Sequence, residues 1–126
     1  MDRFLLICLA GALGTGTRYL VSVWAAERFG ASFPYGTLFV NLAGCFAIGF
    51  VMHVALNVAA FSPTLRLAIT AGFLGGLTTY SSFNYETTKL LLDGSYGLAA
   101  WNFAATAGGG FAAGLGGLAL GRVAIG

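Results

Sequence analysis

A short uncharged stretch, residues 80–83, carries the side chains best suited to contact an ion. Tyr80 and Phe83 are three residues apart, so a helix would place both rings on one face. Ring edges carry positive partial charge and can face an anion without a cationic side chain nearby. Aromatic pairs more often pack against a core or lipid, but the adjacent hydroxyls of Ser81 and Ser82 would be costly to place in lipid. We therefore interpret the stretch as a candidate anion path.

Asn41 is a polar side chain well inside another apolar segment. Its amide offers two N–H donors that an anion could accept. A hydrogen bond between helices is the other common use of asparagine in membranes. The sequence leaves both interpretations open, and we expect Asn41 at a depth similar to that of residues 80–83.

Two residue pairs, Gly75-Gly76 and Thr78-Thr79, precede the aromatic stretch. Both weaken a helix, glycine through backbone freedom and threonine through β-branching. Backbone outside a helix is tolerated at membrane depth only where it is buried in protein or lines a wet cavity, so a break here indicates a binding or permeation site. The freed carbonyls of Gly75, Gly76 and Thr78 could coordinate a hard cation such as Na⁺.

The charged residues near the apolar segments have alternative uses. Arg18 could extend its charged end towards water, or it could attract anions into a vestibule, because charges within membranes tend to be functional. Glu86 and Lys89 are three residues apart and could pair with each other. One histidine without a partner carboxylate in the apolar segments argues against a hydrolase.

The composition places most of the chain in a membrane. Apolar types make up 58% of the 126 residues and charged types 8%, whereas a soluble domain carries roughly 25% charged residues. We predict an all-α membrane protein with a single domain over residues 1–126. The net charge of +2 gives no reason to expect nucleic acid, and the two cysteines lack the spacing of a metal site.

Charges divide the chain into four predicted transmembrane helices, each near the roughly 20 residues that a membrane requires. The third helix is the broken one. The predicted bounds are residues 4 to about 24, about 36 to 57, 67–92 and 94–121. The six Lys and Arg residues divide three against three between the two sides. This balance predicts insertion in both orientations and an antiparallel, dual-topology homodimer.

The fourth predicted helix is rich in glycine. Gly110 with Gly114, and Gly117 with Gly121, have the four-residue spacing that lets helix backbones approach closely. Packing within one subunit or across a dimer is the expected use. The alternative is that the missing side chains leave room for a pore or for a partner's ring.

Three runs of the sequence closely resemble the Fluc (CrcB) family of fluoride channels. They are GTLFVNLAG at residues 36–44, GFLGGLTTYSSF at residues 72–83 and GTGTRY at residues 14–19. The resemblance covers the whole chain and implies a channel that exports cytoplasmic fluoride passively across the bacterial inner membrane, conferring fluoride resistance. It also implies a dual-topology homodimer with two antiparallel pores and a structural Na⁺ at the dimer centre.

The resemblance also implies roles for individual residues. Asn41 would line each pore, and Phe83 and Tyr80 would be the rings that face fluoride, although relatives usually have phenylalanine in place of Tyr80. Carbonyls of Gly75 and Thr78 would hold the Na⁺. The other matching positions are Ser81 and Ser82 in a hydroxyl track, Thr106 as a polar residue of the fourth helix, Thr37 in the pore, and Arg18 as the vestibule candidate.

A small four-helix multidrug transporter coupled to protons is the alternative. Proton coupling needs a titratable group inside the membrane, and the first predicted helix has Asp2 and Glu27 only at its ends. We therefore expect a channel rather than a transporter or an enzyme. Its expected partners are fluoride, the lipid bilayer and a second copy of the chain, without a nucleotide or redox cofactor.

Overall fold

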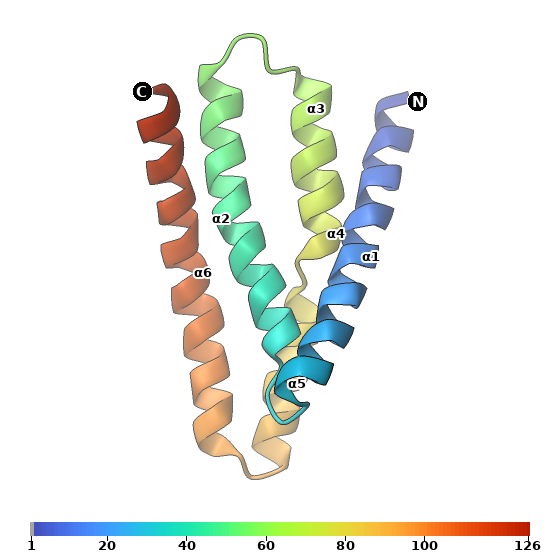
Figure 1. The fold of residues 1–126 in the computed structure, drawn as a ribbon, viewed down its shortest axis with the longest axis vertical. Helices are drawn as coiled ribbons and strands as arrows, with labels where there is room; N and C mark the ends of the chain where they lie inside the picture. The colour runs from blue at the N-terminus through green and yellow to red at the C-terminus, as the bar shows by residue number, and fades with distance from the viewer. Residues whose placement is uncertain (1) are drawn as a thin grey trace.

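The computed structural model describes residues 2–126, and none of these residues lies in a β-strand. The chain runs along the bundle four times, as the sequence predicts, and the start of the first helix and the end of the last helix lie at the same end of the bundle (Figure 1). Its elements are α1 (Asp2–Phe29), α2 (Tyr35–Asn57), α3 (Pro63–Leu67), the π-helix η1 (Ala68–Leu74), α4 (Gly75–Leu77), α5 (Tyr80–Leu92) and α6 (Tyr96–Ile125).

Helices α1, α2 and α6 are each long and apolar enough to cross a membrane. Helix α1 runs on to Phe29, past the end predicted near Trp24, because residues 25–29 contain no glycine or proline. Gly30 has a φ of 88°, and its N–H donates to the carbonyl of Ala26 at 2.9 Å. A glycine in this left-handed conformation is a common helix end.

The third pass along the bundle stops and restarts at Thr78 and Thr79. Helix α4 ends at Leu77, both threonines have extended backbone, and α5 begins at Tyr80 (Figure 1). The hydroxyl of Thr79 accepts a hydrogen bond from the backbone N–H of Ser82 at 3.2 Å. Thr79 therefore caps the new helix as well as interrupting the old one.

The glycine pair before the interruption is helical, contrary to the expectation that it would help to break the helix. A Cβ at Gly76 would overlap the carbonyl oxygen of Gly11, and one at Gly14 would overlap the carbonyl oxygen of Phe73. Glycines at these positions let α1 pack against η1 and α4, backbone to backbone. The break falls instead on the β-branched pair that follows.

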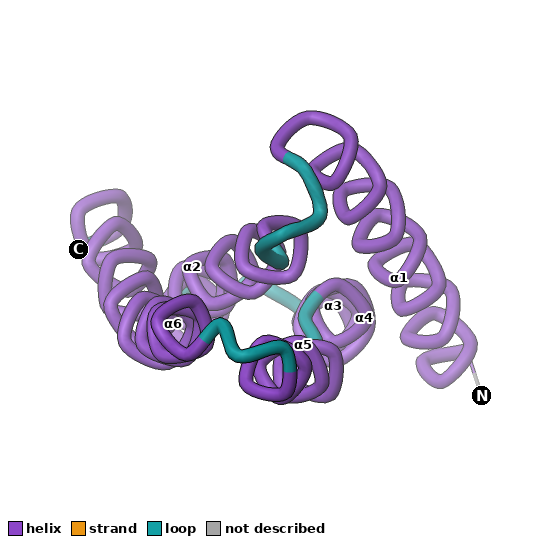
Figure 2. The backbone as a smooth tube through the Cα atoms, turned by 90° about the horizontal axis from the view of Figure 1, so that it is seen from below, coloured by secondary structure: helices purple, strands orange, loops and turns teal. Residues whose placement is uncertain are grey.

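Helices α2 and α6 lie side by side in both views and make the most extensive contact in the bundle (Figures 1 and 2). A Cβ at Gly49 would overlap the Gly114 carbonyl, and a Cβ at Gly117 would overlap the carbonyl of Phe46. A Cβ at Gly110 would lie 3.3 Å from the Cys45 sulfur. The spaced glycines of α6 therefore serve packing within one chain, which is the first of the two uses expected.

Candidate ion pathway

Asn41 of α2 binds the interrupted backbone of the third pass. Its Nδ2 donates to the carbonyl of Thr79 at 3.0 Å, and its Oδ1 accepts from the N–H of Thr79 at 2.8 Å. Asn41 is 8% exposed, and at such a site an unpaired backbone group would be costly. One amide N–H of Asn41 remains for another acceptor. The interhelical bond is therefore present, and it leaves room for the ion-facing role.

Arg18 of α1 contacts the other side of the interruption. Its Nε donates to the carbonyl of Gly76 at 3.0 Å, and the contact is partly buried. The side chain therefore binds the backbone of α4. Arg18 is not among the residues that line the two cavities described below.

The rings of Tyr80 and Phe83 lie together, as their spacing predicts. Their centroids are 5.6 Å apart and the rings meet edge to face at 69°. Phe83 is buried, and its ring lies 6.0 Å from that of Phe103 on α6. Tyr80 is 75% exposed, so its ring stands on the open side of this chain.

A cavity of about 340 Å³ adjoins these rings, and we call it the ring cavity. None of the residues that line it is charged. The hydroxyl oxygen of Thr106 is buried and has no hydrogen-bond partner among residues 2–126. The lining consists of Asn41, Gly44, Cys45, Ile48, Thr70, Leu74, Gly75, Thr78, Thr79, Tyr80, Phe83 and Thr106.

Several predicted site residues lie outside the ring cavity. Ser81 is exposed, with its hydroxyl oxygen 3.4 Å from that of Thr79, and Ser82 contributes its backbone N–H to the helix cap. Arg18 and Thr37 are also absent from the lining. A hydroxyl track through Ser81 and Ser82 thus stays a prediction.

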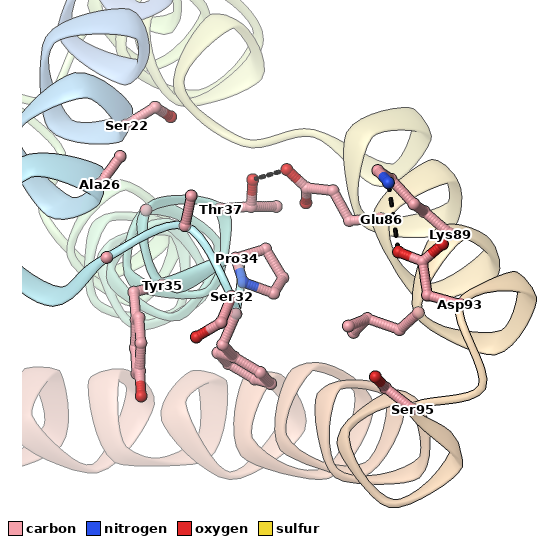
Figure 3. A pocket seen from close by; sticks show the side chains of 15 residues that line it. Ser22, Ala26, Ser32, Pro34, Tyr35, Thr37, Glu86, Lys89, Asp93 and Ser95 are labelled. Carbon is pink, nitrogen blue, oxygen red and sulfur yellow. Dashed lines mark hydrogen bonds and ion pairs between the residues drawn. The ribbon is translucent and has the colours of Figure 1, made fainter.

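Thr37 and Glu86 meet in a second cavity of about 440 Å³, the loop cavity, which lies beside the α1–α2 loop (Figure 3). The hydroxyl of Thr37 donates to Oε2 of Glu86 at 3.0 Å, whereas Nζ of Lys89 binds Oδ2 of Asp93 at 3.2 Å. The predicted pair of Glu86 with Lys89 is therefore wrong. Glu86 finds its partner on α2, and Lys89 finds its partner four residues further along the chain, at the residue that follows α5.

The carbonyls predicted to hold Na⁺ belong to residues on the ring cavity. No hydrogen bond reaches the carbonyl oxygens of Gly75 and Thr78 within residues 2–126, because the helix ends before their usual donors. Free backbone oxygens are suitable ligands for a hard cation. The residues present therefore fit the predicted ion. Residues 2–126 contain no cluster of three or more His, Cys, Asp or Glu side chains that could hold another metal.

Asn102 is a buried polar residue that the sequence reasoning did not select. It is 1% exposed on α6, and its Nδ2 donates to the hydroxyl of Thr87 at 2.9 Å. The Thr87 hydroxyl in turn donates to the carbonyl of Phe83 at 2.8 Å. Asn102 thus connects α6 to the turn of α5 that carries Phe83. Its signal in the sequence is a lone amide in the charge-free run 94–121.

Comparisons with known proteins identify a family for this chain. The family described as "CrcB-like protein, Camphor Resistance (CrcB)" matches residues 5–118. A relative from Anaeromyxobacter sp. (strain K), described as "Fluoride-specific ion channel FluC", is 52% identical over 106 residues, 84% of each chain. Relatives with the same description are 51% identical in Geotalea uraniireducens (81% of this chain, 82% of the relative) and 56% identical in Geobacter sp. strain M21 (75% and 77%). The chain therefore belongs to the CrcB family.

Proposed function

We propose that this multi-pass membrane protein is a fluoride channel of the bacterial inner membrane. Its relatives are described as fluoride-specific ion channels and come from bacteria. A membrane potential that is negative inside favours the exit of an anion by about 2.3 kcal/mol per 100 mV. Passive flow through the channel would therefore lower cytoplasmic fluoride and confer resistance without any coupled energy source.

The observation that carries this proposal is the ring cavity. Within it, the amide of Asn41, the unpaired hydroxyl of Thr106 and the two rings come together without a charged side chain. A small anion needs N–H and O–H donors to replace its hydration shell. Asn41 keeps one N–H for that purpose, and ring edges add positive partial charge along the same wall.

Two copies of the chain, inserted in opposite orientations, form the working channel in this proposal. The even division of Lys and Arg residues supports dual insertion. The exposed ring of Tyr80 and the unpaired carbonyls of Gly75 and Thr78 support a second copy on this side of the bundle. A Na⁺ ion held by these carbonyls would join the two interrupted backbones, and each copy would complete the other's pathway, giving two pores.

The test is fluoride release from liposomes that contain the purified protein. With internal potassium fluoride and valinomycin to carry K⁺, a fluoride electrode should record rapid release that protein-free liposomes do not give. Drug–proton exchange without fluoride release would contradict the proposal and favour the transporter alternative.

A matched pair of ring variants sharpens this test. Phe83→Leu removes a ring that lines the cavity, whereas Phe103→Leu removes the next ring along, which does not line it. The Phe83 variant should lower release by about 2- to 13-fold, since an aromatic contact is worth roughly 0.5–1.5 kcal/mol. The Phe103 variant should retain release. Equal loss in both variants would argue against a path beside Phe83.

A further inference from the structure

We infer that Arg18 is a positioning residue that holds the interrupted backbone through the carbonyl of Gly76. The inference rests on the proposed function, because it assigns Arg18 a task within that pathway. It replaces the earlier alternatives for Arg18, a charge that attracts anions into a vestibule or a side chain that extends to water.

The interruption at Thr78 and Thr79 leaves the Gly76 carbonyl without its helical partner. In a continuous helix, the N–H of residue 80 would donate to this carbonyl. Thr78 and Thr79 are extended, so that N–H belongs to the start of α5 and the bond is lost. Water is scarce at membrane depth, so a protein group must take its place. The Nε of Arg18 does so, at 3.0 Å.

Close packing of α1 against the third pass fixes this arrangement. Gly14 and Gly76 let the two backbones touch, since a Cβ at either would overlap a carbonyl of the other segment. Arg18 follows Gly14 by four residues and therefore lies on the same face of α1. The close contact at Gly14 therefore directs the side chain of Arg18 towards α4.

The surroundings of Arg18 argue against a role as a free charge. Arg18 lines neither cavity. It has no carboxylate partner, because the only salt bridge within residues 2–126 joins Lys89 and Asp93. Its hydrogen-bond partner is the carbonyl of Gly76. Gly76 follows Gly75 directly and lies two residues before Thr78. Holding Gly76 therefore restrains the backbone that joins the two carbonyls proposed to bind Na⁺.

Two substitutions separate the donor of Arg18 from its charge. In Arg18→Gln, Nε2 is the same number of bonds from Cα as the arginine Nε, so the donor remains and the charge is removed. In Arg18→Lys, a methylene takes the place of Nε, so the charge remains and the donor is displaced. Arg18→Met removes both. Fluoride release from liposomes is measured for each variant, after size-exclusion chromatography has shown the wild-type elution position.

A positioning role predicts that the glutamine variant keeps wild-type release. The lysine and methionine variants should lose roughly tenfold, as expected for one hydrogen bond from a charged donor. Normal release with lysine and loss with glutamine would overturn the inference in favour of attraction by charge. Equal loss in all three variants, or no loss in any, would overturn it as well.

Hydrogen exchange provides a readout that does not depend on transport. Peptides that cover residues 74–83 should exchange faster in the lysine and methionine variants than in the wild type, and at the wild-type rate in the glutamine variant. If the wild type releases no fluoride, the proposed function fails, whereas this comparison still decides whether Arg18 holds the backbone. Unchanged exchange in the methionine variant would refute the positioning role.

Discussion

Helix α2 makes two contacts of opposite kinds along its length. Against α6, backbone meets backbone, and Gly49 and Gly117 have no room for another atom. Against the third pass, the side chain of Asn41 reaches across and pairs with both polar groups of Thr79. The first contact is limited by space, and the second is limited by the hydrogen-bond partners that an interrupted helix requires.

The difference shows how rigidity and polarity are divided in this bundle. The glycine contact fixes the distance between α2 and α6 and brings no polar side chain with it. The asparagine contact lets backbone leave the helix next to the ring cavity without leaving Thr79 unpaired. An ion pathway needs both, because donors can face an ion only where the surrounding helices do not yield.

The largest effect should come from Asn41→Leu, which removes the polar contact between α2 and the third pass. Leucine leaves the N–H of Thr79 unpaired, at a cost on the order of 1–3 kcal/mol, and it removes the second hydrogen bond that the Thr79 carbonyl receives, at about 0.5–1.5 kcal/mol more. We expect a large fall in the thermal midpoint in detergent and loss of fluoride release. The midpoint is the temperature at which half of the protein remains in the monodisperse size-exclusion peak after heating.

Asn102→Leu is the matched control for this prediction. Asn102 is also buried, but its recorded partner is the side chain of Thr87, whose hydroxyl keeps its bond to the Phe83 carbonyl. Losing one such bond costs about 0.5–1.5 kcal/mol. If Asn102→Leu lowers the midpoint as much as Asn41→Leu, this contradicts the larger cost expected for leaving a buried backbone N–H unpaired.

A smaller loss of stability should follow Gly117→Ala, which disturbs the glycine contact between α2 and α6. The added Cβ would overlap the carbonyl of Phe46 and lie 2.9 Å from the backbone nitrogen of Phe50. Both are backbone atoms, so no side-chain rotation can relieve the overlap. Helices α2 and α6 must therefore move apart, at a cost of about 1–3 kcal/mol. The thermal midpoint in detergent should fall accordingly.

Gly108→Ala serves as the control on the same helix, because a Cβ there meets nothing within 4 Å. Alanine is favoured over glycine in a helix by about 1 kcal/mol, so this variant should be as stable as the wild type or more stable. Equal destabilisation by the two substitutions would argue that helix packing at Gly117 is not the cause.

Local rules predicted the bundle and one of its contacts from the sequence alone. Charge-free intervals predict helical passes because a membrane excludes unpaired charge, and the spacing of Gly117 and Gly121 predicts close packing. The same rules could not choose which weak pair would interrupt the third pass. Gly76 stays helical because Gly11 of α1 packs against it, and that contact depends on the whole fold.

Polar partners were the least predictable part of the site. Arg18 binds Gly76, 58 residues away, and Thr37 binds Glu86, 49 residues away. Such pairs depend on how each helix is rotated, which composition and spacing do not specify. The prediction that paired Glu86 with its near neighbour Lys89 failed for that reason. Asn41 and Phe83 were selected as candidate pore residues by their sequence motifs rather than by their partners.

The smallest effect is expected at Gly44, where α2 packs closely against the interruption of the third pass. Gly44 follows Asn41 by three residues, and a Cβ there would overlap Cγ2 of Thr78. Thr78 cannot rotate freely, since its hydroxyl donates to the Leu74 carbonyl at 2.9 Å. Gly44→Ala should therefore cost about 1 kcal/mol, at the low end for overpacking.

Thr78→Ser should rescue Gly44→Ala, because serine lacks the obstructing methyl and keeps the hydroxyl. A cycle of the four proteins, compared by thermal midpoint, measures the coupling between the two sites. Additive effects would contradict a contact between Gly44 and that methyl. Recovery would mean that a removable side-chain group sets the spacing of α2 from the interruption. No such rescue is expected for Gly117→Ala, where the obstacle is the main chain of Phe46.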